Sequence, residues 1–198
     1  MTLLTIVQDA AEEIGFPKPG SVIGNTDQIA TQMLRLLNRE GESLSRHAWE
    51  NLIKEHTFTL VTGDQDYATP AGFRYLVPNT IWNRDSKRPV NSPLTSEEWQ
   101  FYKGWSTVTG LVLRARIRAN QLEFDQTIEA ADNGKTIAYE YVSKYWTQSA
   151  AGVDQQKFAA DSDIANIDEE LLTLGLVWRF RKAKGLDWQP DYIEYDKL

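Results

Sequence analysis

One segment near the carboxyl end of the chain is apolar around almost its whole circumference if it folds as a helix. It runs from about Ile167-Asp168 to Lys184, and Gly185 follows as a helix stop. Its apolar residues are Leu171, Leu172, Leu174, Leu176, Val177, Trp178, Phe180 and Ala183. An ordinary surface helix buries a single stripe, so this pattern predicts a helix that is buried on two sides.

Two interpretations of this helix stay open from the sequence. Both sides can pack into the chain's own core, or one side can pack against a neighbouring subunit. In the second case the expected interface residues are Leu171, Leu174, Trp178 and Phe180.

The amino end of the chain predicts two further helices. Apolar residues at helical spacing predict the first over 3–14. The second should begin with Asn25 or Thr26 as its N-cap and run to about Ile53, with Gly41 as a place where it can bend.

The middle of the chain changes to the alternating pattern of strands. Extended segments are predicted over 57–61, 67–68, 80–82, 88–90 and 135–146. A hairpin over 114–125 should turn at Ala119-Asn120. Thr95 and Glu98 have the spacing of a capping box, which predicts a short helix after them.

The order of these elements predicts an α+β fold. A helical body of two N-terminal helices and a C-terminal helix should carry an inserted, antiparallel β-rich domain. We assign 1–54 and 164–198 to the helical platform, 55–146 to the β-rich insertion and 147–163 to a connecting loop.

The charge and composition narrow the classes of function. A net charge of -7 disfavours a protein that grips nucleic acid, because such binding neutralises phosphates with basic residues. The chain has no cysteine, no basic leader sequence and no apolar run of membrane-spanning length. We therefore expect a soluble protein that is made in a reducing cytoplasm and binds no membrane.

The reactive groups that an enzyme needs are scarce. The two histidines, His47 and His56, lack the spacing of a helical metal pair, and no nucleotide-binding glycine loop is present. The paired acids 12–13, 97–98 and 169–170 are explained by helix surfaces and helix starts, and the acid pairs at 64–66 and 161–163 by turns and caps. We expect no enzyme activity, no cofactor and no metal.

Three arginines alternate along the first strand of the predicted hairpin. Arg114, Arg116 and Arg118 should share one face of that strand. Such a row could contact an acidic partner protein, or it could be a solvated strand face.

The order of elements carries a resemblance to a known family. Residues 57–70 form a hairpin pattern with a proline-containing loop, 73–82 a following strand, and 171–186 a closing helix ahead of an aromatic tail. Over most of its length the chain thereby resembles the head-to-tail adaptor proteins of tailed bacteriophages, also called head completion or connector proteins.

The resemblance implies a structural virion protein at the head-tail junction, made in the host cytoplasm. Twelve copies would dock as a ring on the portal protein, extend the DNA channel without sequence-specific binding, and offer a platform to a tail or neck protein. The portal-docking residues would be Leu186, Trp188, Tyr192 and Tyr195. The alternative is a monomeric protein-binding module whose β-rich domain recognises one partner.

Overall fold

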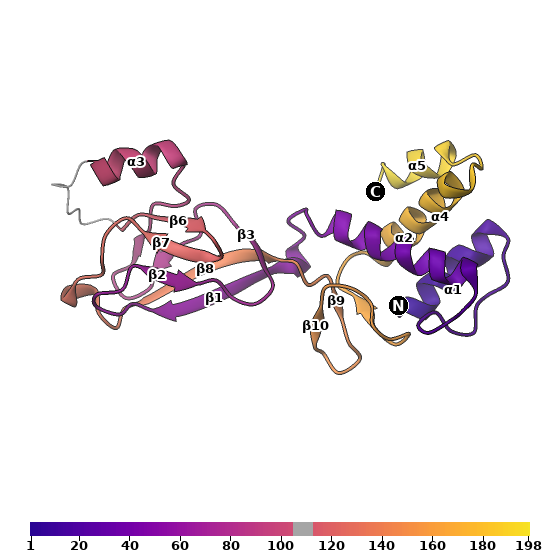
Figure 1. Cartoon of the computed structure of the whole chain (residues 1–198), viewed down its shortest axis with the longest axis horizontal. Coiled ribbons are helices and arrows are strands. Elements are labelled where there is room, and N and C mark those ends of the chain that lie inside the picture. Colours follow the sequence, from indigo (N-terminus) through magenta and orange to yellow (C-terminus); the bar gives the residue numbers. More distant parts are fainter. Residues whose placement is uncertain (105–112) are drawn as a thin grey trace. The chain divides into compact units, whose positions relative to one another are not determined.

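The chain folds into two compact units, seen in a computed structural model that describes residues 1–104 and 113–198 (Figure 1). The helical unit comprises 1–52 and 144–198, and the β unit comprises 53–143. Helices and antiparallel sheets occur together, so the predicted α+β class is confirmed.

The helical unit contains four α-helices and a small sheet among its described residues. The helices are α1 (Leu3–Ile14), α2 (Gln28–Leu44), α4 (Glu169–Lys184) and α5 (Gln189–Tyr195), and a 3-10 turn, η1, spans Glu50–Leu52. The strands β9 (Thr147–Gln148), β10 (Asp154–Gln155) and β11 (Ile164–Ala165) pair antiparallel in the order β10-β9-β11. Segment 147–163, predicted as a connecting loop, therefore contains two of these strands.

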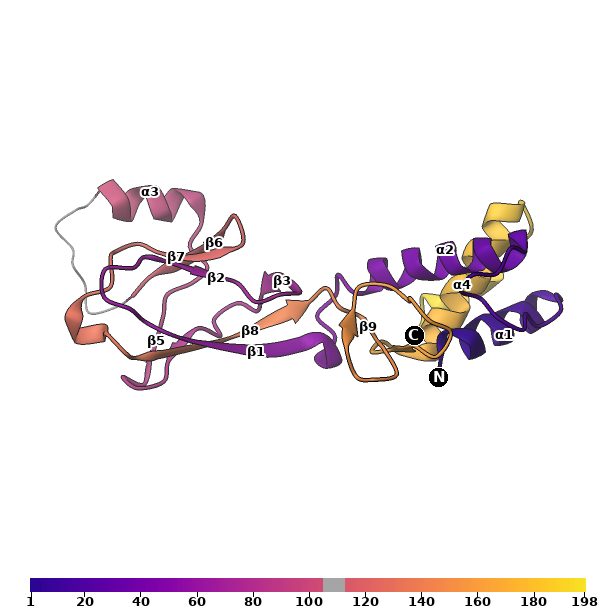
Figure 2. The same cartoon turned by 60° about the horizontal axis from the view of Figure 1, so that its bottom comes forward.

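Helix α4 is the central element of the helical unit. It packs against α1, α2 and α5, which lie around it in Figures 1 and 2. Leu171, Trp178 and Phe180 are buried inside this single chain, and Leu174 is half-buried. The two-sided apolar pattern is thus satisfied by the chain's own core, so three of the four expected subunit-interface residues present little free surface.

The beginning of α2 differs from the prediction in its cap. The Asp27 carboxylate accepts a hydrogen bond from the Ile29 amide at 2.8 Å, so Asp27 is the N-cap rather than Asn25 or Thr26. The Asn25 side chain instead accepts from the Asp27 amide at 2.9 Å and shapes the turn before the helix.

The end of α2 was predicted too far along the chain. The helix stops at Leu44, not near Ile53. The Trp49 indole N–H donates to the Leu44 carbonyl at 2.8 Å, which satisfies one of the acceptors that a helix end leaves open. The apolar residues beyond Leu44 had extended the periodic pattern past the true end.

Gly41 of α2 leaves room for the buried side chain of Trp146. A Cβ atom at this position would overlap the six-membered ring of Trp146, a side chain with no exposed surface. Gly41 therefore stands in α2 because an indole ring lies directly against the helix backbone.

Among its described residues, the β unit contains two sheets. The larger sheet joins β1 (Ile53–Thr59), β8 (Thr136–Ser143), β3 (Phe73–Leu76), β4 (Trp82–Asn83) and β5 (Arg88–Pro89), with β8 pairing to β1, β3 and β4. The smaller sheet has the order β2 (Asp66–Ala68), β7 (Gln121–Phe124), β6 (Ala115–Arg118). Their shared core includes Leu122, Phe124, Ile137 and Tyr139.

The predicted capping box and hairpin turn are both confirmed. Before α3 (Ser96–Gly104), the Thr95 amide donates to the Glu98 carboxylate at 2.8 Å and the Glu98 amide donates to the Thr95 hydroxyl at 3.2 Å. Ala119 and Asn120 have φ values of 49° and 60°, as a two-residue hairpin turn with two left-handed residues requires.

We predict that Gly41→Ala destabilises the protein by about 2 kcal/mol, because overpacking against Trp146 outweighs the gain of about 1 kcal/mol in helix propensity. Urea unfolding monitored by circular dichroism measures the change. Gly20→Ala is the control, since no atom lies within 4 Å of a Cβ placed there. An unchanged or higher stability of Gly41→Ala would contradict the packing described for Trp146.

Candidate functional site

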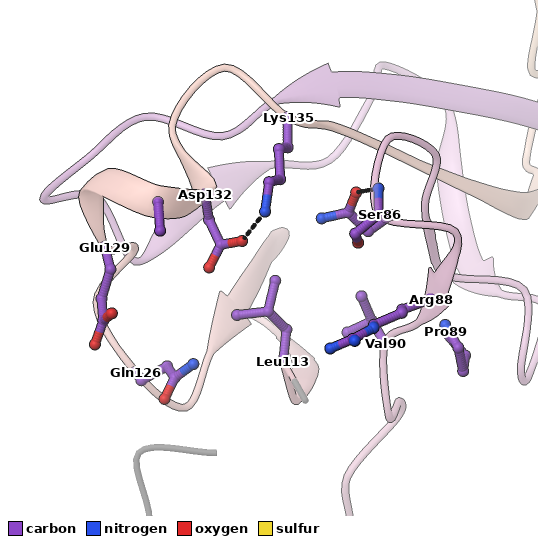
Figure 3. Close-up of a pocket in the computed structure, with 11 residues that line it drawn as sticks. Ser86, Arg88, Pro89, Val90, Leu113, Gln126, Glu129, Asp132 and Lys135 are labelled. Carbon is purple, nitrogen blue, oxygen red and sulfur yellow. Dashed lines mark hydrogen bonds and ion pairs between the residues drawn. The ribbon is translucent and has the colours of Figure 1, made fainter. Parts of the chain in front are cut away.

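The β unit contains a hollow of about 370 Å³ between the β4–β5 turn and residues 126–135 (Figure 3). Its walls carry Arg88, Glu129, Gln126 and the ion pair between Lys135 and Asp132, whose Nζ–Oδ1 distance is 2.7 Å. Among its described lining residues there is no histidine and no nucleophile next to a base. The hollow can hold a polar side chain, but this set of residues does not form a reaction centre.

The three arginines of β6 have separate environments. Arg114 pairs with Asp125 at 3.0 Å, and Arg116 pairs with Glu123 at 2.7 Å. Arg118 is exposed at the end of the strand.

Two of these arginines also hold helix α3 onto the small sheet. The Arg116 guanidinium carbon lies 3.9 Å from the ring centroid of Trp99, and that of Arg114 lies 4.0 Å from the ring centroid of Tyr102. Each guanidinium thus lies against an aromatic ring of α3 and pairs with a carboxylate of its own sheet. The three arginines therefore do not form one continuous basic face. Arg118 is the one that is exposed and could contact a partner.

The aromatic tail folds back onto α4. The Trp178 ring centroid lies 6.0 Å from that of Trp188, 5.2 Å from that of Tyr192 and 6.0 Å from that of Tyr195. Such edge and tilted contacts are favourable for aromatic rings. Residues after Gly185 are therefore a folded part of the helical unit, with Trp188 and Tyr195 half-buried.

A buried carboxylate ties the tail to two other helices. Glu40 on α2 has no exposed surface; it is paired with Arg179 of α4 and accepts a hydrogen bond from the Tyr195 hydroxyl at 2.5 Å. Gly175 makes room for it, because a Cβ there would lie 2.7 Å from the Glu40 Cγ. Burial, together with the hydrogen bond to Glu40, raises the pKa of the Tyr195 hydroxyl far above its ordinary value of 10.0.

A second ion pair fixes the start of α5. Arg181 donates from one nitrogen to both carboxylate oxygens of Asp191, at 2.7 and 2.8 Å. Burial raises the pKa of the nearby Glu13, and the charges of Asp191 and Glu194 add to this rise while Arg181 opposes it. The surroundings of α5 are consequently rich in negative charge.

The tail exposes three apolar residues that have acidic residues next to them in the sequence. Leu186, Tyr192 and Ile193 are 50%, 38% and 55% exposed, and we call these three residues the docking strip. The exposed acids Asp187, Glu194 and Asp196 lie beside them in the sequence. Of the four residues expected to dock on a portal, Leu186 and Tyr192 belong to this strip, and the Tyr192 ring also contacts Trp178 of α4. The other two, Trp188 and Tyr195, are half-buried.

The described residues contain neither a cluster of potential metal ligands nor a membrane-spanning helix. No group of three or more His, Asp or Glu side chains in 1–104 and 113–198 is arranged to hold a metal ion. Within the same residues, no helix combines the length and the apolar composition needed to cross a bilayer.

Sequence reasoning missed the two residues that organise this surface. Ile193 lies in a segment too short to show a periodic apolar pattern, so no such pattern singles it out. Glu40 looks like any charged residue on an amphipathic helix, and its burial depends on Arg179, which lies far along the chain. The glycine at position 175, inside a strongly apolar helix, was the available signal of a close neighbour.

Comparison with known proteins gives one family. The family model described as SU10 adaptor protein matches residues 1–196, which is nearly the whole chain. Comparison with curated proteins gives no match.

We predict that Tyr195→Phe lowers the stability by about 1–2 kcal/mol at pH 8, because the buried Glu40 loses a hydrogen-bond donor. The folded protein holds the Tyr195 proton more tightly than the unfolded chain does, so the contribution is complete below pH 10 and is lost as the pH rises above it. Urea unfolding at pH 8, 9.5 and 10.5 should show the wild type approaching the variant. A constant difference across this range would contradict the assignment.

Proposed function

The chain belongs to the SU10 adaptor protein family, and we propose that it is the head-to-tail adaptor of a tailed phage. In this proposal several copies, twelve by the resemblance noted above, form a ring on the portal protein. The ring extends the DNA channel and offers the attachment platform for a tail or neck protein. The protein acts in the virion as a structural part and carries out no reaction.

The docking strip is the observation that carries the proposal. The tail leaves two apolar side chains at least half exposed, Leu186 and Ile193, and covering them with a partner would be favourable. Two of the three residues of the strip lie on α5, a short helix that is held by Glu40 and Arg181, so this part of the strip meets a partner with little further ordering. We propose that this strip contacts the portal.

The acidic residues next to the strip in the sequence suggest the character of the portal surface. Asp187, Glu194 and Asp196 would favour a partner with an apolar centre and basic surroundings. Docking should accordingly weaken as the salt concentration rises.

The net charge of -7 fits a channel component. Double-stranded DNA carries dense negative charge, and a basic wall would hold it by releasing counterions. A wall with surplus acid lets DNA slide past without binding. An assembled ring whose lumen is lined by arginine would contradict this part of the proposal.

We predict that the double variant Leu186→Asp, Ile193→Asp weakens binding to purified portal rings by at least about tenfold. Each substitution places a charge where an apolar contact should form, and central contacts of this kind dominate interfaces. Co-sedimentation with portal rings at several adaptor concentrations measures the affinity. The point variants are preferable to removal of the tail, which would also uncover Trp178 and Glu40.

The matched control is Val153→Asp, which changes a residue of the same unit that is 61% exposed outside the tail. It should bind portal like the wild type. Urea unfolding must show that all variants remain folded. Full binding by the folded double variant would remove the strip from the docking surface.

A further inference from the structure

The outer face of the large sheet in the β unit carries a second hollow. It measures about 340 Å³ and is bordered by Glu55 of β1, Glu140 of β8 and Trp82 and Arg84 from β4 and its end. The register places Glu55 directly opposite Glu140, and Trp82 opposite Ala138. Side chains of directly paired residues share a face of a sheet, so these groups border the same open space.

Trp82 is an unusual residue to find on this face. Its side chain is 43% exposed, although tryptophan gains much free energy from burial. No ring or cation contact to it occurs among the described residues, in contrast to Trp99 and Trp178. An exposed tryptophan beside a hollow is typical of the centre of a protein-protein interface.

The two glutamates give the hollow its charge. Directly opposed carboxylates on neighbouring strands repel each other and destabilise a sheet. Arg84 relieves only one of them, since its guanidinium donates to Glu55 at 2.5 Å. Within the described part of the chain, Glu140 is exposed and forms no ion pair, so the face keeps one uncompensated negative charge beside an aromatic ring.

We infer that this hollow receives an arginine side chain of a partner protein. The guanidinium would lie against the exposed ring of Trp82 and donate hydrogen bonds to Glu140. Arg84 shows that the face accommodates a guanidinium next to its carboxylates. The inference goes beyond the docking strip, because it concerns the β unit and a different set of residues.

The same charges decide against other occupants. The uncompensated charge of Glu140 beside the ring repels the phosphates of nucleic acid, so DNA is disfavoured here. A neutral apolar side chain would cover Trp82 but leave Glu140 unpaired and partly desolvated, which costs free energy. An arginine satisfies the ring and the carboxylate together.

The test uses the full-length protein labelled with ¹⁵N and the probe N-acetyl-arginine-N-methylamide. The indole N–H resonance of Trp82 is assigned from the spectrum of Trp82→Phe. We expect that resonance to shift saturably as the probe is added. The uncharged analogue N-acetyl-citrulline-N-methylamide, which has almost the same shape, should leave it unchanged.

Variants then locate the charge that the probe contacts. Glu140→Gln should weaken binding by about fivefold, whereas Glu97→Gln, an exposed glutamate on α3, should have no effect. No shift of Trp82, equal shifts with both probes, or full affinity in Glu140→Gln would each overturn the inference. If the Trp82 resonance shifts when only the protein concentration is raised, a second copy of this chain occupies the hollow, and the inference of a separate partner is overturned. Binding to portal rings is not involved in this test, so its outcome is independent of the docking strip.

Discussion

The helical unit depends on how one fully buried carboxylate is satisfied. Glu40 has no exposed surface, and a buried charge is tolerated only when partners replace the water it has lost. Arg179 supplies the opposite charge and Tyr195 a hydrogen bond, so α2, α4 and α5 must keep one arrangement. Gly175 completes this constraint, because a larger residue there would occupy the space of the Glu40 side chain.

This constraint links the core to the surface on which the proposed function rests. At one end of α5, the Tyr195 hydroxyl donates a hydrogen bond to Glu40. At the other end, Asp191 pairs with Arg181. Ile193 of the same short helix is exposed to solvent. A helix of this length is not stable alone in water, so the buried charges allow it to hold Ile193 in an ordered position.

Sequence patterns predicted the features that depend on neighbours along the chain. The Thr95–Glu98 box, the turn at Ala119-Asn120 and the closing helix follow from local spacing, and the structure confirms them. Contacts between distant residues left no such signal: Trp146 against Gly41, or Arg116 against Trp99. The same limit explains why the second apolar side of α4 pointed equally to the chain's own core and to a subunit interface.

An adaptor must bind two different proteins at once, and it therefore needs two surfaces of different character. The docking strip consists of three exposed apolar residues with acids next to them in the sequence, suited to a hydrophobic contact. The hollow beside Trp82 is a small pocket for one basic side chain, suited to a specific but weaker contact. The two surfaces belong to different compact units, so each can change without disturbing the core that supports the other. Under the proposed function, the division of the chain into two units lets a single small protein join two partners.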